Sequence, residues 1–270
     1  SAIDWLNLAV SRPHDLIRDG GRLDLARVRA NLISMPTASE AERRLAADRL
    51  ASCGYCTPPS PPRGTAPTVM LRAGRADVFG FYHVCTINTW REVMEEQLRR
   101  WTSSGLAEAT TRIFATVVGP HAAEGVATLA AACGERLEIV HRSEDASAFE
   151  RPILKYMRRF CEEGEPLARA CWYMHAKGVS QERFQNANVT DWRRLMEHFV
   201  VERWQDCLAA LDGHDACGVN WRSQPGPHFS GNFWWARPRY LASLPLRIGP
   251  LRFDPERWLA TNQPYVCCLY

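Results

Sequence analysis

The chain has 270 residues, of which 46% are apolar and 23% are charged. This composition is typical of a globular protein with one large domain, or with one domain and an appendage. The 33 basic and 30 acidic residues give a formal net charge of only +3, so charge provides no general attraction to nucleic acid or to an anionic membrane. No apolar run is long enough to cross a bilayer, and the first residues do not resemble a secretory signal. We therefore expect a cytoplasmic protein with no nucleic-acid partner and no membrane span.

Three regions are predicted along the chain. Residues 1–57 are expected to form a helical appendage, with helices near Asp24–Ile33 and Ser39–Ser52. Residues 58–76 are expected to be a linker or a wrapping arm, because closely spaced prolines and glycines suit neither a helix nor a central strand. Residues 77–270 are expected to form the main domain.

The 10 cysteines are scattered through predicted helices and strands, which indicates reduced, buried thiols. Cys53 and Cys56 have the spacing of a zinc or redox pair, but no second pair of this kind follows. Structural zinc is the less favoured interpretation because such a site needs four ligands. Dithiol catalysis is less favoured still, because a proline-rich stretch follows the pair in place of a helix.

From Asp77 onward, apolar runs alternate with amphipathic stretches about four times. The expected strands are Asp77–Ile87, Arg112–Val118, Leu137–His141 and Ala168–His175, and the helices between and after them begin near Trp90, Ala122, Pro152 and Thr190. This order predicts an α/β fold of three layers, with a mainly parallel sheet and helices on both of its faces. Ligands of such sheets bind at the carboxyl ends of the strands.

Two strand ends carry candidate ligand-binding residues. Tyr82, His83 and Asn88 lie at the end of the first strand. The fourth strand delivers His175, Lys177 and Gly178 to the same edge, where a cation and free backbone N–H groups suit phosphate oxygens. The alternative for Lys177 is an ordinary surface lysine beside a histidine whose hydrogen bonds are satisfied.

The stretch His228–Arg237 combines aromatic rings with a small polar turn. Its candidate sugar-binding or acceptor-binding residues are His228, Ser230, Gly231, Asn232, Trp234 and Trp235. Flat apolar faces beside a few fixed polar groups suit the wall of a sugar pocket. A buried aromatic strand entered through a glycine turn explains the same pattern, and the stretch alone leaves both interpretations open.

Two carboxylates follow this aromatic stretch. Pro255 is expected to start a short helix, with Asp254 as its N-cap and Glu256 in its first turn. An ordinary capped helix accounts for both acids. A carboxylate aimed into a pocket walled by tryptophan would instead suit a general base.

Several common motifs are absent from the sequence. There is no glycine-rich phosphate loop, which weakens ATPase and dehydrogenase hypotheses, and no Gly-x-Ser-x-Gly elbow of a hydrolase. The segment Asp212–Asp215 contains two carboxylates, but it is expected to be a solvated turn. No cofactor is predicted, and dependence on Mn²⁺ or Mg²⁺ stays open.

The order of several motifs resembles a family of glycosyltransferase-like proteins with a GT-A-type fold that binds nucleotide-diphospho-sugars. The resemblance extends over about Val78–Trp258, and the segments that carry it are Phe81–His83, Ser104–Leu106, Phe149–Glu150, Tyr173–Gly178, Trp192–Met196 and His228–Ala236. It implies transfer of a sugar from a nucleotide diphosphate donor to a glycan, lipid-linked or protein acceptor. The Asp-x-Asp element that holds a metal ion in many such enzymes is replaced here by His175-Ala-Lys177, so the sequence departs from the family at this point and a metal-independent reaction is one hypothesis.

The resemblance also implies roles for the candidate residues. Glu256, with Asp254 as second choice, would be the base of an inverting reaction, and His175 with Lys177 would neutralise the leaving diphosphate. Trp234 or Trp235 would stack on the sugar, while Ser230 and Asn232 would bind its hydroxyls. The competing hypothesis is a related domain that binds a nucleotide sugar or a glycan without catalysis.

Overall fold

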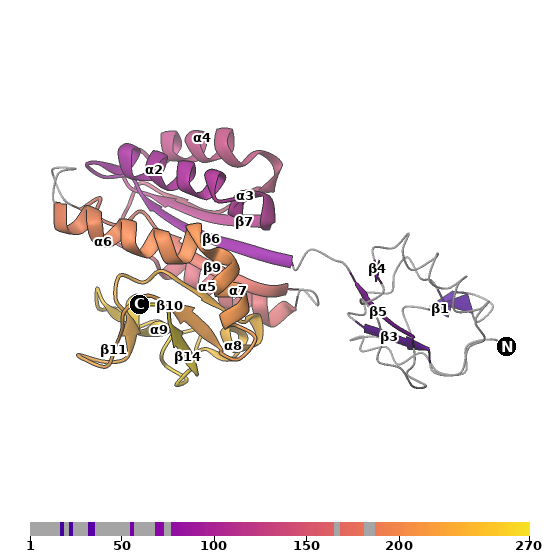
Figure 1. Cartoon of the computed structure of the whole chain (residues 1–270). Helices are drawn as coiled ribbons and strands as arrows, with labels where there is room; N and C mark the ends of the chain where they lie inside the picture. The colour runs from indigo at the N-terminus through magenta and orange to yellow at the C-terminus, as the bar shows by residue number, and fades with distance from the viewer. Residues whose placement is uncertain are drawn as a thin grey trace. The chain divides into compact units, whose positions relative to one another are not determined.

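The computed structural model divides the chain into two compact units, Ser1–Arg75 and Ala76–Tyr270 (Figure 1). It describes residues 77–164, 168–180 and 187–270, together with the backbone of five short strands between residues 17 and 72. No helix in these described residues is long and apolar enough to span a membrane.

In the N-terminal unit the described residues form only short strands. Strand β1 (Ile17–Arg18) pairs with β2 (Arg22–Leu23), and β5 (Thr68–Arg72) lies between β3 (Leu32–Met35) and β4 (Tyr55–Cys56), with every pairing antiparallel.

Two of the sequence predictions concern residues that form these strands. The helix expected at Asp24–Ile33 overlaps β3 at its last two residues, and the expected linker contains β5, where Thr68 and Val69 favour extended backbone. The other residues of the predicted helices, and the Cys53 and Cys56 thiols, lie outside the described residues.

A seven-stranded sheet forms the centre of the second unit. Its order is β14-β10-β13-β9-β6-β7-β8. The strands are β6 (Asp77–Cys85), β7 (Thr110–Val118), β8 (Leu137–Ser143), β9 (Ala168–His175), β10 (Ala216–Gly218), β13 (Trp234–Ala236) and β14 (Val266–Cys268). Only β13 runs antiparallel to its neighbours within this sheet. The predicted mainly parallel sheet is therefore confirmed.

Alternate residues of the strands enter two separate hydrophobic cores, one on each face of the sheet. In β6, for example, Val78, Tyr82 and Val84 join the first core, whereas Phe79 and Phe81 join the second. The predicted three layers are thus confirmed.

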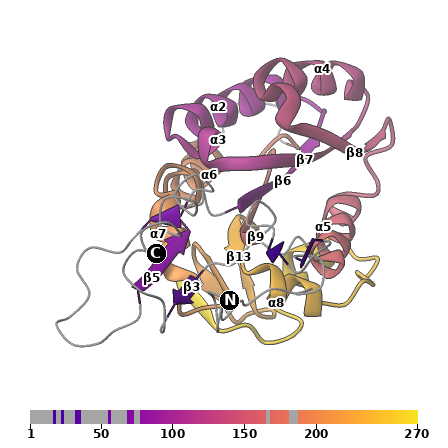
Figure 2. The ribbon, with the colours of Figure 1, turned by 90° about the vertical axis from the view of Figure 1, so that its right-hand side faces the viewer.

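Different helices cover the two faces. The first core is covered by α2 (Trp90–Ser103), α3 (Leu106–Ala109), α4 (Ala122–Cys133), α6 (Ala187–Glu197) and α7 (Trp204–Ala210). The second is covered by α5 (Arg151–Glu163), α8 (Pro238–Ser243) and α9 (Asp254–Trp258). Figure 2 shows α2, α3 and α4 together along one side of β6 and β7.

The helix expected to start at Thr190 is already formed at Ala187, and it continues through a π-helix (His198–Glu202) before α7. A pair of short strands, β11 (Trp221–Arg222) and β12 (His228–Phe229), precedes β13.

Candidate functional site

The direction of the chain through the sheet reverses between β6 and β9. From β6 the chain passes to β7 and then to β8 on one side, and afterwards returns to place β9 on the other side of β6. Open α/β sheets bind ligands at such a switch point, outside the carboxyl ends of the strands. The two strands reach this point with paired histidines, because His83 lies opposite His175 in the register.

His175 forms a buried pair with Glu150, the residue that precedes α5. Its Nδ1 lies 3.0 Å from Glu150 Oε1, and the two side chains are only 12% and 13% exposed. Its Nε2 lies 3.0 Å from the carbonyl oxygen of Gly231. Both ring nitrogens of His175 therefore lie at hydrogen-bonding distance from an oxygen of a neighbouring residue.

The second oxygen of Glu150 accepts two further hydrogen bonds. The Tyr173 hydroxyl and the Asn232 amide each donate to Oε2 over 2.6 Å. Asn232 in turn accepts a hydrogen bond from the Trp234 indole over 2.8 Å through its Oδ1. We call Glu150, Tyr173, His175 and Asn232 the carboxylate network.

The network keeps Glu150 ionised. Burial alone would raise the pKa of Glu150, but the charge and hydrogen bond of His175, with the nearby His83 and Tyr173, outweigh it and hold this pKa well below its usual range. Burial, and then the charge of Glu150, raise the pKa of Tyr173, which stays a hydrogen-bond donor.

His83, opposite His175 on β6, has a different environment. Burial lowers the pKa of His83 to about 4, so its imidazole is neutral near pH 7. Its Nδ1 lies 2.8 Å from the Thr116 hydroxyl of β7. The switch point therefore combines one neutral histidine with one that is paired to a carboxylate.

The turn Ser230–Asn232 is sterically fixed against the helix layer. Gly231 has φ +85° and Asn232 has φ +60°, a region in which glycine and asparagine are favoured. A Cβ atom on Gly231 would lie 2.3 Å from Met196 Sδ and 2.9 Å from the Trp192 indole nitrogen. The positive φ and these contacts both oppose a Cβ atom, which explains the glycine in the Ser-Gly-Asn motif.

The loop after β9 is held through its carbonyl groups. Gln97 of α2 donates to the carbonyl of His175 over 3.0 Å, and Asn88 donates to that of Val179 over 3.1 Å. Between these attachments lie Lys177, which is partly exposed, and Gly178, which has φ +94°. Among the described residues, no carboxylate lies within ion-pair distance of the Lys177 ammonium group.

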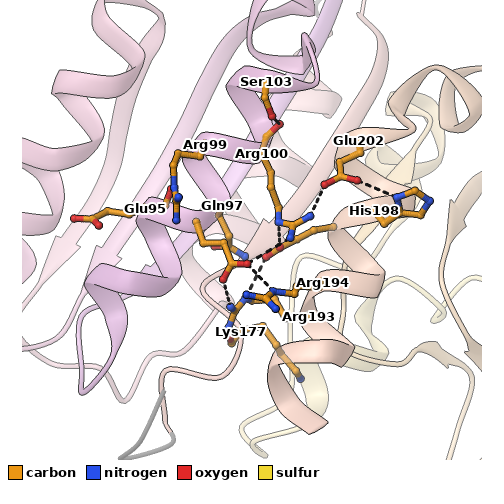
Figure 3. Close-up of polar contacts among 12 residues, drawn as sticks. Glu95, Gln97, Arg99, Arg100, Ser103, Lys177, Arg193, Arg194, His198 and Glu202 are labelled. Atoms are coloured by element: carbon orange, nitrogen blue, oxygen red, sulfur yellow. Dashed lines mark hydrogen bonds and ion pairs between the residues drawn. The ribbon is translucent and has the colours of Figure 1, made fainter. Parts of the chain in front are cut away.

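A cluster of buried charges supports this loop from behind (Figure 3). Arg193, 2% exposed, lies 2.5 Å from Glu96 and 3.3 Å from Glu197, while Arg100 lies 3.2 Å from Glu197. Burial raises the pKa of Glu197 to about 7 despite the two arginines. The cluster joins α2 to α6. Through the hydrogen bond between Glu197 and Gln97 it positions Gln97, which donates to the His175 carbonyl.

Several candidate residues are enclosed within the protein. Tyr82 is fully buried and donates to Gln97 over 2.6 Å. Trp234 and Trp235 are 1% and 0% exposed, so neither ring has a face open to a sugar, in contrast to the predicted stacking role. Both rings are buried because β13 lies between β9 and β10 in a sheet that helices cover on both faces. Trp234 therefore packs in the second core and Trp235 in the first.

Two further candidates lie near the start of β13. His228 is partly exposed, and its Nδ1 lies 2.7 Å from the Gly226 carbonyl oxygen. Ser230 is also partly exposed, and its backbone N–H donates to the carbonyl oxygen of Asn220 over 3.0 Å. Neither side chain belongs to the carboxylate network.

The two late carboxylates differ in their surroundings. The sequence predicted Asp254 as the N-cap of α9, and this prediction is wrong because the helix begins at Asp254 itself. Asp254 Oδ2 accepts a hydrogen bond from the Leu251 N–H over 2.7 Å. Glu256 is partly exposed, and its charge adds to those effects that raise the pKa of Tyr173. Glu256 therefore acts electrostatically on the network, while Asp254 stabilises its own loop.

Sequence reasoning missed the central residue of the site. Glu150 was noticed only as part of a motif, because nothing in its local sequence shows that it meets His175 and Asn232. The signal for Gln97 in the sequence is its polar side chain among the apolar residues Val93, Met94, Leu98 and Trp101 of the helix that begins at Trp90. Among the described residues, no group of three or more His, Cys, Asp and Glu side chains lies close enough together to hold a metal ion.

The fold and this site define an α/β protein with a network of polar side chains at the carboxyl edge of a mainly parallel sheet. The chain belongs to the family described as Domain of unknown function (DUF8361), whose model matches residues 81–259. No curated protein matches the sequence.

Solved structures with partial similarity include the manganese complex of Rv0371c from Mycobacterium tuberculosis H37Rv, which is 14% identical, with 72% of this chain and 87% of that chain covered and a TM-score of 0.36. Residues 1–349 of TarS from S. aureus are 11% identical, with 71% and 58% covered and a TM-score of 0.36. A 4-diphosphocytidyl-2C-methyl-D-erythritol synthase from Anaerococcus prevotii is 7% identical, with 61% and 72% covered and a TM-score of 0.33. These scores are too low to carry an argument about function.

Proposed function

We propose that this protein is a glycosyltransferase that moves a sugar from a nucleotide diphosphate donor to an acceptor hydroxyl. The observation that supports this most is the charged edge at the switch point, where the Glu150–His175 pair lies at the end of β9 and the partly exposed Lys177 follows two residues later. Ligands with phosphate groups suit a cation and exposed backbone at the carboxyl ends of parallel strands. The acceptor would be a glycan, a lipid-linked sugar or a protein.

Lys177 is the proposed partner of the donor diphosphate, with Gly178 providing close backbone approach. His175 has both ring nitrogens engaged, so we assign it a positioning role: it ties the end of β9 to the Ser230–Asn232 turn. Lys177 would stabilise the negative charge that develops on the leaving diphosphate, a task that metal ions perform in other enzymes.

Replacement of Lys177 by Met tests this role. A hydrogen bond to a charged group contributes roughly 1.5–3 kcal/mol, so we expect donor affinity to fall by about tenfold or more, measured by calorimetry. Lys155→Met on the exposed side of α5 is the matched control, and equal affinities of the two variants would contradict the assignment. The donor is first found by a thermal-shift screen of UDP-, GDP-, CMP- and TDP-sugars with and without Mn²⁺.

Glu256 is the proposed base that deprotonates the acceptor hydroxyl, with Asp254 as second choice. Glu150 is poorly suited to this task, because its oxygens accept three hydrogen bonds and its pKa is low. We expect Glu256→Gln to reduce transfer by about 10²- to 10⁴-fold and to leave donor binding intact. Full transfer activity in this variant would remove Glu256 from the mechanism and move attention to Asp254→Asn.

We further propose that transfer does not need a divalent metal ion. The expected result is unchanged turnover after EDTA treatment. Activity that EDTA abolishes and Mn²⁺ restores would overturn this part of the proposal.

A second candidate function is binding of a nucleotide sugar or glycan without catalysis. It is favoured by the internal hydrogen bonds of Glu150, whose two oxygens are already engaged by His175, Tyr173 and Asn232. Donor binding without measurable hydrolysis or transfer would support it over the enzyme.

A further inference from the structure

The loop between α8 and α9 exposes large apolar side chains. Leu246, Leu251 and Phe253 are 38%, 66% and 55% exposed, and Phe149, just before α5, is 40% exposed. Large apolar side chains gathered at one surface mark a site of interaction more often than chance exposure does.

The loop that exposes these side chains is held in place by contacts with the second core and with α5. Ile248 in its middle is 9% exposed and belongs to the second core. Arg151 of α5 donates to the carbonyl oxygens of Gly249 and Leu251 over 2.8 and 2.6 Å, and a Cβ atom on Gly249 would lie only 2.2 Å from Asp254 Oδ2. The loop is therefore fixed at several points while Leu251 and Phe253 stay outside.

Arginines accompany the exposed apolar side chains. Arg247 and Arg252 are exposed on the same loop, and the Arg252 guanidinium carbon lies 5.8 Å from the centre of the Phe253 ring. Arg151 lies 5.6 Å from the Phe149 ring and also binds the Leu251 carbonyl. One guanidinium thus connects Phe149 with the loop in a single surface, while the Asp254 carboxylate accepts the Leu251 N–H.

We propose that this surface, made by Phe149, Leu246, Arg247, Leu251, Arg252 and Phe253, docks on an anionic membrane. Apolar side chains enter the boundary between headgroups and acyl chains, and arginines beside them pair with anionic headgroups. The formal net charge of the chain is only +3, so the attraction comes from this local combination. The proposal goes beyond sugar transfer, and docking does not require that the protein be an enzyme.

Co-sedimentation of the full chain with lipid vesicles tests the proposal. We expect binding to vesicles of phosphatidylcholine with phosphatidylglycerol at least tenfold stronger than to phosphatidylcholine alone, and weaker at high salt. Leu251→Ser with Phe253→Ser, and separately Arg247→Gln with Arg252→Gln, should each weaken binding about tenfold or more. Tyr265→Ser with Tyr270→Ser, which changes residues 66% and 70% exposed outside the surface, is the control and should bind as the unchanged chain does.

Three outcomes would overturn the proposal. The first is no binding to either kind of vesicle, and the second is binding that neither pair of substitutions weakens. The third is a dimer in light scattering that the Leu251 and Phe253 substitutions dissociate, because the surface would then hold a second copy. All changed side chains are exposed, and thermal melts verify that each variant is folded.

Discussion

The carboxylate network makes a sharp prediction for Glu150→Gln. The substitution keeps the size of the side chain and removes its charge. A glutamine oxygen can still accept from Tyr173 and Asn232, but the amide NH₂ then faces the Nδ1 of His175, and the ion pair is lost. Removing one partner of a buried pair costs about 3–5 kcal/mol. We take the lower end, about 3 kcal/mol, because the pair is 12% and 13% exposed and so keeps some contact with solvent.

This cost corresponds to a fall of about 6–12 °C in Tm for a domain of this size. Urea unfolding at pH 7 measures it directly. Glu138→Gln is the matched control, since Glu138 is 46% exposed and pairs with Arg112 at the surface, where ion pairs contribute about 0–1 kcal/mol.

The pH dependence gives a second measurement on the same variant. The pKa of Glu150 is lower in the folded protein than in the unfolded chain, where it is about 4.3, so its contribution is complete above that pH and is lost as the pH falls. The difference in unfolding free energy between the unchanged protein and Glu150→Gln should therefore shrink from pH 7 toward pH 3. If Glu150→Gln costs no more than Glu138→Gln, or if the difference does not depend on pH, the network does not hold the site together.

Two further predictions concern the supports of the site. The pKa of Glu197 is raised to about 7 in the folded protein, so the charge on Glu197 lowers the free energy of unfolding as the pH rises from about 4.3 to 7. Glu197→Gln should remove up to about 3 kcal/mol of this pH-dependent loss of stability, measured by urea unfolding at pH 5 and pH 8. Gly231→Ala should destabilise the protein by more than about 1 kcal/mol, because the φ of +85° and the contact with Met196 both oppose a Cβ atom. The comparison is Gly213→Ala, where a Cβ atom would meet open space; an unchanged Tm for Gly231→Ala would show that the turn adapts without cost.

The sequence predicted those parts of the fold that local patterns determine. The continuous apolar run of β6 is typical of a strand covered on both faces, and the apolar stripes of α2 and α4 have the period of a helix, so each could be located without knowing its neighbours. The edge of the sheet at His83 and His175 followed from the alternation of strands and helices. The same local reasoning failed at Trp234 and Trp235, because the pattern of aromatic residues does not show whether a strand lies inside a sheet or at a pocket.

The residues of the carboxylate network could not be assembled from sequence for a topological reason. Glu150, His175 and Asn232 are far apart in the chain, and they meet because β13 runs antiparallel to β9, with Trp234 opposite Tyr173. In this orientation the beginning of β13 lies at the same edge of the sheet as the end of β9. A parallel β13 would have carried the Ser230–Asn232 turn to the opposite edge, away from Glu150.

The direction of one short strand therefore unites two motifs that the sequence shows separately. The His175-x-Lys177 segment supplies the charge beside the switch point, and the Ser-Gly-Asn turn supplies the Gly231 carbonyl and the Asn232 amide that hold His175 and Glu150 in place. A change in the turn should thus alter the position of Lys177, because His175 connects the two segments. For this reason Asn232→Ala should weaken donor binding although Asn232 is 1% exposed and its amide is occupied by Glu150; donor affinity equal to that of the unchanged protein, measured by calorimetry on the folded variant, would show that the two motifs act independently.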